Sequence, residues 1–202
     1  MRGLGPHVGR KRRMEIARHH PLRRLFEELV RRRLYDDARC QSPDVADYVS
    51  DLLVRFTRAD RLYSIRDARG QCLDDVGEML LESNPLLSER GSLIREREVR
   101  KHVGDYTLFM CGLFPQWVAK LPSRRPVRLD SFVDYMEAGK ESYRVVASFR
   151  EFEFREQAGL FGRLAERFEL CVFGLNLVSQ DLERLQGFYY SGVKRILGGE
   201  PN

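Results

Sequence analysis

The residues in this sequence best suited to chemistry are a histidine and two acids, Glu98, His102 and Asp105. Separations of four and three residues place side chains on one face of a helix, so we expect these three to lie together. A histidine between carboxylates can act as a general acid or base near neutral pH, and it can also bind a metal. No second histidine lies nearby in the sequence, and ion pairing on a helix surface is the structural alternative.

Two further residues extend this candidate pocket towards the protein interior. Tyr106 opens a run, Tyr106 to Phe114, whose apolar character on all sides is typical of a helix buried in a domain centre. Asn176 lies in a similar run, Leu170 to Val178, where a buried amide needs a hydrogen-bond partner and a backbone carbonyl is the expected one. The candidate pocket comprises Glu98, His102, Asp105, Tyr106 and Asn176. The sequence assigns them no catalytic role, predicts no metal and leaves any cofactor unassigned.

The burial of His102 separates a functional site from a purely structural histidine. If Glu98 and Asp105 control its titration, its pKa should lie above the unperturbed value of about 6.5, unless burial opposes that shift, because negative charge favours the imidazolium. A water-lined cleft beside the ring would indicate a site, whereas a closed and fully paired ring would indicate a structural role.

Motifs for other reactions are absent from the sequence. There is no Gly-x-x-x-x-Gly-Lys-Ser/Thr, no Gly-x-Gly-x-x-Gly after a predicted strand, and no Gly-x-Ser-x-Gly. Glu-x-x-His pairs, which hold di-iron centres in helical bundles, are missing too, and this argues against such a centre. The four cysteines are widely separated, which favours reduced thiols in a cytoplasmic protein over a zinc or redox motif. They are Cys40, Cys72, Cys111 and Cys171.

Basic charge is concentrated at the N-terminus. The net charge is +5, and residues 1–13 contain five of the 35 basic residues and no acid, so the other 30 basic residues balance the 30 acids. We therefore expect a basic, flexible leader over residues 1–13 and a single helical domain over residues 14–202. A second basic cluster, Arg31 to Arg33, spreads around its helix and has acids close by in sequence, so we expect ion pairs there.

Hydrophobic periodicity predicts helices in nearly every segment. The predicted helices begin at or near Pro21, Pro43, Asp74, Ser92, Asp130, Gln157 and Phe188. Between the second and third, Leu62 to Leu73 is expected to form a turn between short extended pieces. We predict an all-α, single-domain bundle of six or seven helices around two apolar central helices, Ser92 to Phe114 and Gln157 to Leu185. Gly112 and Gly174 lie within these helices and are expected to let them approach closely.

Three segments carry a resemblance to known proteins. They are Ile65-Arg66-Asp67-Ala68-Arg69-Gly70, the stretch from His102-Val103-Gly104-Asp105-Tyr106 to Pro115, and the stretch from Phe168-Glu169-Leu170-Cys171 to Asn176. Together they resemble a family of uncharacterised bacterial all-helical proteins of similar length, over about Pro21 to Leu185. The resemblance implies a soluble bacterial protein, and it implies no activity, so no residue role is carried over.

These observations leave three functions open. Because catalytic motifs are absent, the leading expectation is a cytoplasmic helical protein that binds another protein or a second copy of itself as a homodimer. The alternative is a small-ligand, metal-binding or enzymatic pocket around His102. A further alternative is nucleic-acid association through the leader and Arg31 to Arg33, which the balanced charge of the domain disfavours. No membrane span is expected, because no run approaches roughly 18 apolar residues.

Overall fold

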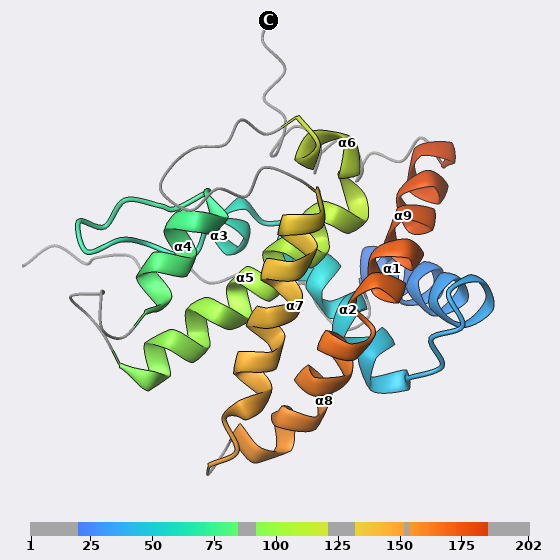
Figure 1. Cartoon of the computed structure of the whole chain (residues 1–202). Coiled ribbons are helices and arrows are strands. Elements are labelled where there is room, and N and C mark those ends of the chain that lie inside the picture. Colours follow the sequence, from blue (N-terminus) through green and yellow to red (C-terminus); the bar gives the residue numbers. More distant parts are fainter. Residues whose placement is uncertain (1–19, 85–91, 121–131, 152–153, 186–202) are drawn as a thin grey trace, which may run out of the picture.

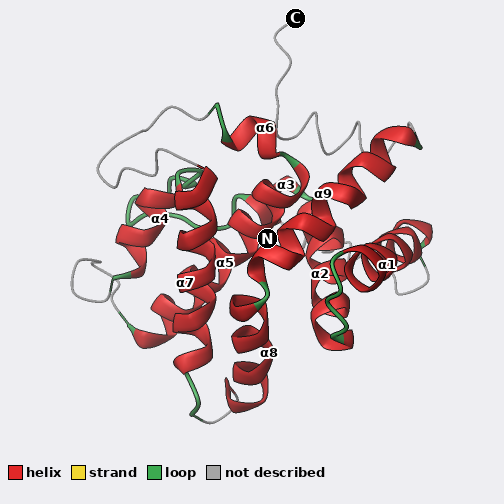
Figure 2. Ribbon diagram, turned by 45° about the vertical axis from the view of Figure 1, so that its right-hand side comes forward, coloured by secondary structure: helices red, strands yellow, loops and turns green. Residues whose placement is uncertain are grey.

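A computed structural model describes residues 20–84, 92–120, 132–151 and 154–185, which are mostly helical (Figure 1). The helices in these ranges are α1 (Pro21–Arg32), α2 (Pro43–Phe56), α3 (Ala59–Leu62), α4 (Val76–Ser83), α5 (Leu93–Leu113), α6 (Pro115–Val118), α7 (Phe132–Ser148), α8 (Arg155–Glu166) and α9 (Phe168–Arg184). A π-helical turn, η1 (Arg33–Asp37), continues α1. Figure 2 shows no strand in this part of the chain, and the predicted all-α fold class is confirmed. The predicted leader, residues 1–13, and the predicted helix from Phe188 lie outside the described residues.

The described helices differ from the predicted set in two respects. The short helices α3 and α6 were not predicted, and each follows directly on the end of a longer helix. The single helix predicted from Gln157 to Leu185 is divided into α8 and α9 at Arg167, where the backbone angles (φ −111°, ψ 20°) depart from helical values. This break lets α8 and α9 pack on different neighbours.

Helix α5 is the longest described helix and runs through the centre of the fold. It begins at Ser92, whose side chain accepts a hydrogen bond from the backbone N–H of Arg95 at 3.1 Å, and it ends before Pro115, which cannot continue a helical ladder. The run Tyr106 to Phe114 is buried throughout, as predicted. The first turns of α5, in contrast, are charged. No helix in the described ranges is both long enough and apolar enough to cross a membrane.

The other helices are arranged around α5. α7 crosses over it, α4 and α9 also pack on it, and α1 packs on α2 at the side of the molecule (Figure 1). α9 is less central than the sequence predicts, because Leu170 and Phe173 are 41% and 50% exposed. One side of α9 therefore faces solvent, and only α5 is enclosed along its whole apolar half.

Gly112 and Gly174 both permit close helix packing, but against different partners. A Cβ atom added at Gly112 would lie 2.6 Å from Cβ of Leu175, so this glycine brings α5 against α9 as predicted. A Cβ atom at Gly174 would instead lie 2.6 Å from a methyl carbon of Leu34 in η1. The expectation that Gly174 also serves the α5–α9 contact is therefore wrong, because consecutive residues of a helix point in different directions and it is Leu175 that faces α5.

The segment from Leu62 to Leu73 forms the predicted turn between extended pieces. Leu73 donates its backbone N–H to the carbonyl of Ile65 at 2.9 Å, and Arg66 and Cys72 form an isolated antiparallel bridge. Gly70 completes the turn at φ 82°, a left-handed conformation that glycine adopts without strain. Leu62 itself ends α3, and two residues that follow it, Ser64 and Ile65, help to enclose the pocket described below.

Alanine at Gly112 should destabilise the protein, whereas alanine at Gly162 should not. Gly162 lies inside α8, where an added Cβ meets nothing within 4 Å. Gly112→Ala should lower the free energy of unfolding by about 1–3 kcal/mol through overpacking against Leu175. Gly162→Ala should raise it by up to about 1 kcal/mol through helix propensity. Urea denaturation of both variants measures the difference, and an equal gain in stability for both would contradict the close α5–α9 contact.

Candidate functional site

A fully buried carboxylate lies where α2, α5 and α7 meet. Asp105, on α5, is 1% exposed and accepts four hydrogen bonds from side chains of these helices. The donors are the Tyr48 hydroxyl at 2.6 Å, the Tyr143 hydroxyl at 2.8 Å, Lys101 Nζ at 2.8 Å and Arg55 Nη1 at 3.1 Å. Two cations and two phenols thus replace the water that an exposed aspartate would bind.

The surroundings of Asp105 keep it ionised. Burial opposes the charged form, yet the positive charges of Lys101 and Arg55 and the hydrogen bond from Tyr48 hold the pKa of Asp105 well below its usual range. Burial and the negative charge of Asp105 raise the pKa values of Tyr48 and Tyr143 well above 10, so both phenols remain protonated donors. The centre is therefore a carboxylate anion among permanent donors.

Aromatic rings surround the two cations that neutralise Asp105. Lys101 Nζ lies 5.3 Å from the ring centroid of Tyr48, and Cζ of Arg55 lies 5.4 Å from the same centroid. Phe161 of α8 meets the Tyr48 ring edge-on at 5.5 Å and lies 5.9 Å from Lys101 Nζ. These contacts, within the range of cation–π attraction, fix the positions of both cations and bring α8 to the cluster.

His102 is buried next to this cluster with one ring nitrogen paired and one unpaired. It is 8% exposed, its Nδ1 lies 3.1 Å from the Ser64 hydroxyl, and its buried Nε2 has no hydrogen-bond partner among the described residues. The ring packs between Phe56 and Tyr106, with centroid distances of 5.7 and 6.2 Å. The histidine is therefore neither exposed nor fully paired.

The pKa of His102 is lowered, because burial opposes the shift that nearby carboxylates would cause. Burial lowers it to about 4, and the charges of Lys101 and Arg55 act in the same sense. Asp105 and a contact with the backbone of Leu62 oppose them without prevailing. Burial thus outweighs the carboxylate. The side chain of Glu98, the other expected influence, is 61% exposed. At neutral pH the imidazole is uncharged.

A pocket of about 290 Å³ opens between α2, α3, the following loop and α5, and we call it the His102 pocket. Apart from His102, its lining contains two acids, Glu98 and Asp105, and the less polar Phe56, Ser64 and Ile65. Its four cations are Arg55, Arg61, Arg95 and Lys101. The lining therefore has an excess of positive charge, with uncharged groups on one wall.

Three residues that line this pocket each carry one buried side-chain nitrogen without a hydrogen-bond partner in the described structure, and four further such polar atoms lie in residues outside the pocket. The three nitrogens of the pocket are Arg55 Nη2, Arg95 Nε and His102 Nε2. More than nine in ten buried polar groups in proteins are hydrogen-bonded, so three exceptions in one pocket require an explanation. Nitrogens from two arginines and a histidine are suited to hold an anion with several oxygen atoms.

The structure brings together three of the five residues proposed from the sequence. Glu98, His102 and Asp105 line the pocket, as their spacing predicts. Tyr106 does not line it: the Tyr106 hydroxyl is buried and donates to the carbonyl of Asp74 at 3.3 Å, and only its ring touches the site.

Asn176 is a correction to the predicted pocket. It lies on α9, where its amide nitrogen donates to the carbonyls of Cys111, Gly112 and Val172 at 2.8–3.0 Å. These are the hydrogen bonds to backbone carbonyls expected of a buried amide. Through them the Asn176 side chain joins α9 to α5. Its position in a different helix pair keeps it out of the His102 pocket.

The sequence did not identify most of the groups that charge this site. Lys101 lies four residues before Asp105, and that spacing was a signal available in the sequence. Arg55 and Tyr48 come from α2 and Tyr143 from α7, and no local pattern connects them with Asp105. In the described ranges, no group of three His, Cys, Asp or Glu residues could hold a metal ion.

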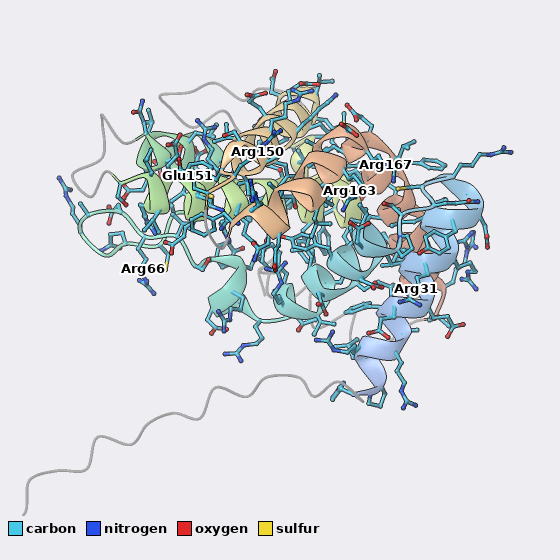
Figure 3. The ribbon with its side chains drawn as sticks, turned by 90° about the horizontal axis from the view of Figure 1, so that it is seen from below. Arg31, Arg66, Arg150, Glu151, Arg163 and Arg167 are labelled. Atoms are coloured by element: carbon cyan, nitrogen blue, oxygen red, sulfur yellow. The ribbon has the colours of Figure 1, made fainter. Side chains whose placement is uncertain are left out.

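The Arg31 to Arg33 cluster makes ion pairs within the protein. Arg31 lies on α1 at the edge of the molecule (Figure 3) and pairs with Asp47 of α2 at 2.6 Å. Arg33 makes a two-pronged contact with Asp181 of α9, both distances being 2.7 Å, and Arg32 joins the same carboxylate at 2.9 Å. These contacts tie α1 to α2 and α9, as the expectation of ion pairing implies.

No protein-family model, curated protein or solved structure matches this chain. The resemblance to bacterial helical proteins, the bacterial origin and the cytoplasmic location therefore stay predictions from the sequence. The function must be inferred from the geometry of the site itself.

Replacing His102 should reduce the sensitivity of the fold to acid. The imidazole pKa is about 4 in the folded protein and about 6.5 in an unfolded chain, so the unfolded state takes up a proton first as the pH falls. The parent should therefore lose about 2 kcal/mol more stability than His102→Gln between about pH 6.5 and about pH 4.5. Urea denaturation at both pH values measures the loss. Equal losses in the two proteins would mean that burial does not disfavour protonation of His102.

Proposed function

We propose that this protein binds a small anion in the His102 pocket. The observation that carries the proposal is the group of three buried, unpartnered nitrogens, on Arg55, Arg95 and His102. An oxyanion placed among them would accept the hydrogen bonds that these nitrogens do not make with the described residues. Such bonds to a charged acceptor are about twice as strong as those between neutral groups.

The charge of the pocket favours an anion. The positive charges of Lys101 and Arg55 are engaged by Asp105, which lies 2.8 and 3.1 Å from them. Four cations against two acids leave an excess of positive charge in the lining, and this excess is at most two because Arg95 is also paired with Glu82 of α4 at 3.8 Å. Because the pocket is partly shielded from water, this excess attracts anions more strongly than the same charges would on an open surface.

The size of the pocket favours a small molecule. At about 290 Å³ it lies near the lower end of the range for small-molecule sites, roughly 300–1,000 Å³. Phe56 and Ile65 add an apolar wall beside the cations. The proposed ligand is thus a small oxyanion, free or joined to a compact organic group.

Protein binding or self-association, the leading expectation from the sequence, stays a prediction. The observation that favours it is the exposure of Leu170 and Phe173, three residues apart on α9. Metal binding and nucleic-acid association have no comparable observation among the described residues. The pocket is the better supported proposal because it combines charge, burial and unpartnered donors in one place.

Removing Arg61 should weaken the binding of an oxyanion without disturbing the fold. Arg61 is an exposed pocket residue, so Arg61→Ala removes a charge without opening the core. With sulfate as the probe, the affinity should fall by about twofold to tenfold, because the pocket loses one of its four positive charges. Chemical-shift titration by NMR at constant ionic strength measures the dissociation constant.

Arg24→Ala is the matched control for this experiment. Arg24 is an exposed arginine of α1 outside the pocket, and its loss changes the net charge by the same amount. Its variant should bind sulfate as the parent does. Equal weakening in both variants would show that sulfate responds only to overall charge, and the proposal would fail.

A further inference from the structure

The two ring nitrogens of His102 have different surroundings. Nδ1 is 3.1 Å from the Ser64 hydroxyl, whose oxygen can accept a hydrogen bond from a protonated ring. Nε2 is buried and has no partner among the described residues. A neutral ring carries one proton, on Nδ1 or on Nε2, and the tautomer decides which nitrogen donates. In an imidazolium both nitrogens are donors, so the protonated ring donates to Ser64 and presents Nε2–H at the same time.

The charged groups around His102 disfavour this protonated form in the ligand-free protein. α2 contributes Arg55, α3 contributes Arg61, and α5 itself contributes Arg95, Lys101, Glu98 and Asp105. Tyr106, whose ring also packs on His102, is a neutral phenol because burial raises its pKa well above 10. With burial as the largest cause, the pKa of His102 is lowered to about 4, and the ring is neutral at physiological pH.

A bound oxyanion would reverse this balance. Its negative charge would offset the pocket cations and act directly on the imidazole, and nearby negative charge favours the charged form of histidine. Binding of the proton and binding of the anion are linked. If the bound anion raises the proton affinity of His102, then protonation of His102 raises the affinity for the anion by the same factor. This gain in affinity for the anion is complete below the pKa of His102 in the free protein, about 4. It is lost as the pH rises through the pKa of His102 in the complex.

We propose, on the basis of the proposed function, that the anion binds together with a proton from solvent. His102 is neutral in the free protein and an imidazolium in the complex, where its Nε2–H donates to the anion. The pocket is therefore selective for oxyanions that keep their own charge in mildly acidic solution, and it holds them more tightly as the pH falls.

Sulfate is the probe for this proposal because it remains a dianion throughout the range used, whereas phosphate itself takes up a proton there. The affinity for sulfate should be about threefold to tenfold higher at about pH 5.5 than at about pH 7.5 at constant ionic strength, one pKa unit corresponding to a factor of ten. In the same samples, the NMR titration midpoint of the His102 ring should rise when sulfate is added.

Two variants assign the proton to His102. His102→Gln should bind sulfate with an affinity that does not change between the two pH values, whereas Glu98→Gln, which removes the exposed acid of the pocket, should keep the pH dependence. If His102→Gln does not fold, the shift of the His102 midpoint in the parent protein gives the same answer.

The outcomes distinguish this inference from the proposed function. Saturable sulfate binding that needs Arg61 but has the same affinity at both pH values would overturn the proton uptake and leave the anion site intact. A pH dependence that persists in His102→Gln would also overturn it. The absence of any saturable sulfate binding would overturn both proposals.

Discussion

The rest of the structure depends on the burial of one negative charge, that of Asp105. A carboxylate without water must be compensated, and removing one partner from such a group typically destabilises a protein by about 3–5 kcal/mol. Here the compensation comes from Lys101 on the same helix, from Arg55 and Tyr48 on α2, and from Tyr143 on α7. The four hydrogen-bond distances are between 2.6 and 3.1 Å. The need to compensate the charge of Asp105 therefore fixes how α2, α5 and α7 lie relative to one another.

The same compensation gives the neighbouring pocket its properties. Lys101 and Arg55 neutralise Asp105 on one side and line the His102 pocket on the other, where Arg55 keeps an unpartnered Nη2. Their charge also adds to the effect of burial, which is the main cause of the lowered pKa of His102. The His102 pocket is positive and partly buried, and its imidazole is neutral. It is therefore suited to bind an anion.

Local patterns in the sequence predicted the helices and the clustering of Glu98, His102 and Asp105, because helical spacing decides which side chains share a face. They also predicted the turn from Leu62 to Leu73. Spacing cannot say which helix packs on that face, so the contacts of Asp105 with residues 50 and 57 positions away were missed. The wrong partner for Gly174 has the same origin, and so does the burial that decides the direction of the His102 pKa, since both depend on long-range packing.

The ionisation of Asp105 is the central claim, and its side-chain carboxyl carbon reports it directly in an NMR titration. An ordinary aspartate is half protonated at about pH 3.9. If Lys101, Arg55 and the two tyrosines hold the charge, the Asp105 signal should stay at its ionised position as the pH is lowered to about 3.5, while exposed aspartates titrate. A signal that moves at or above about pH 3.9 would show that burial prevails over the cations, and it would contradict the account.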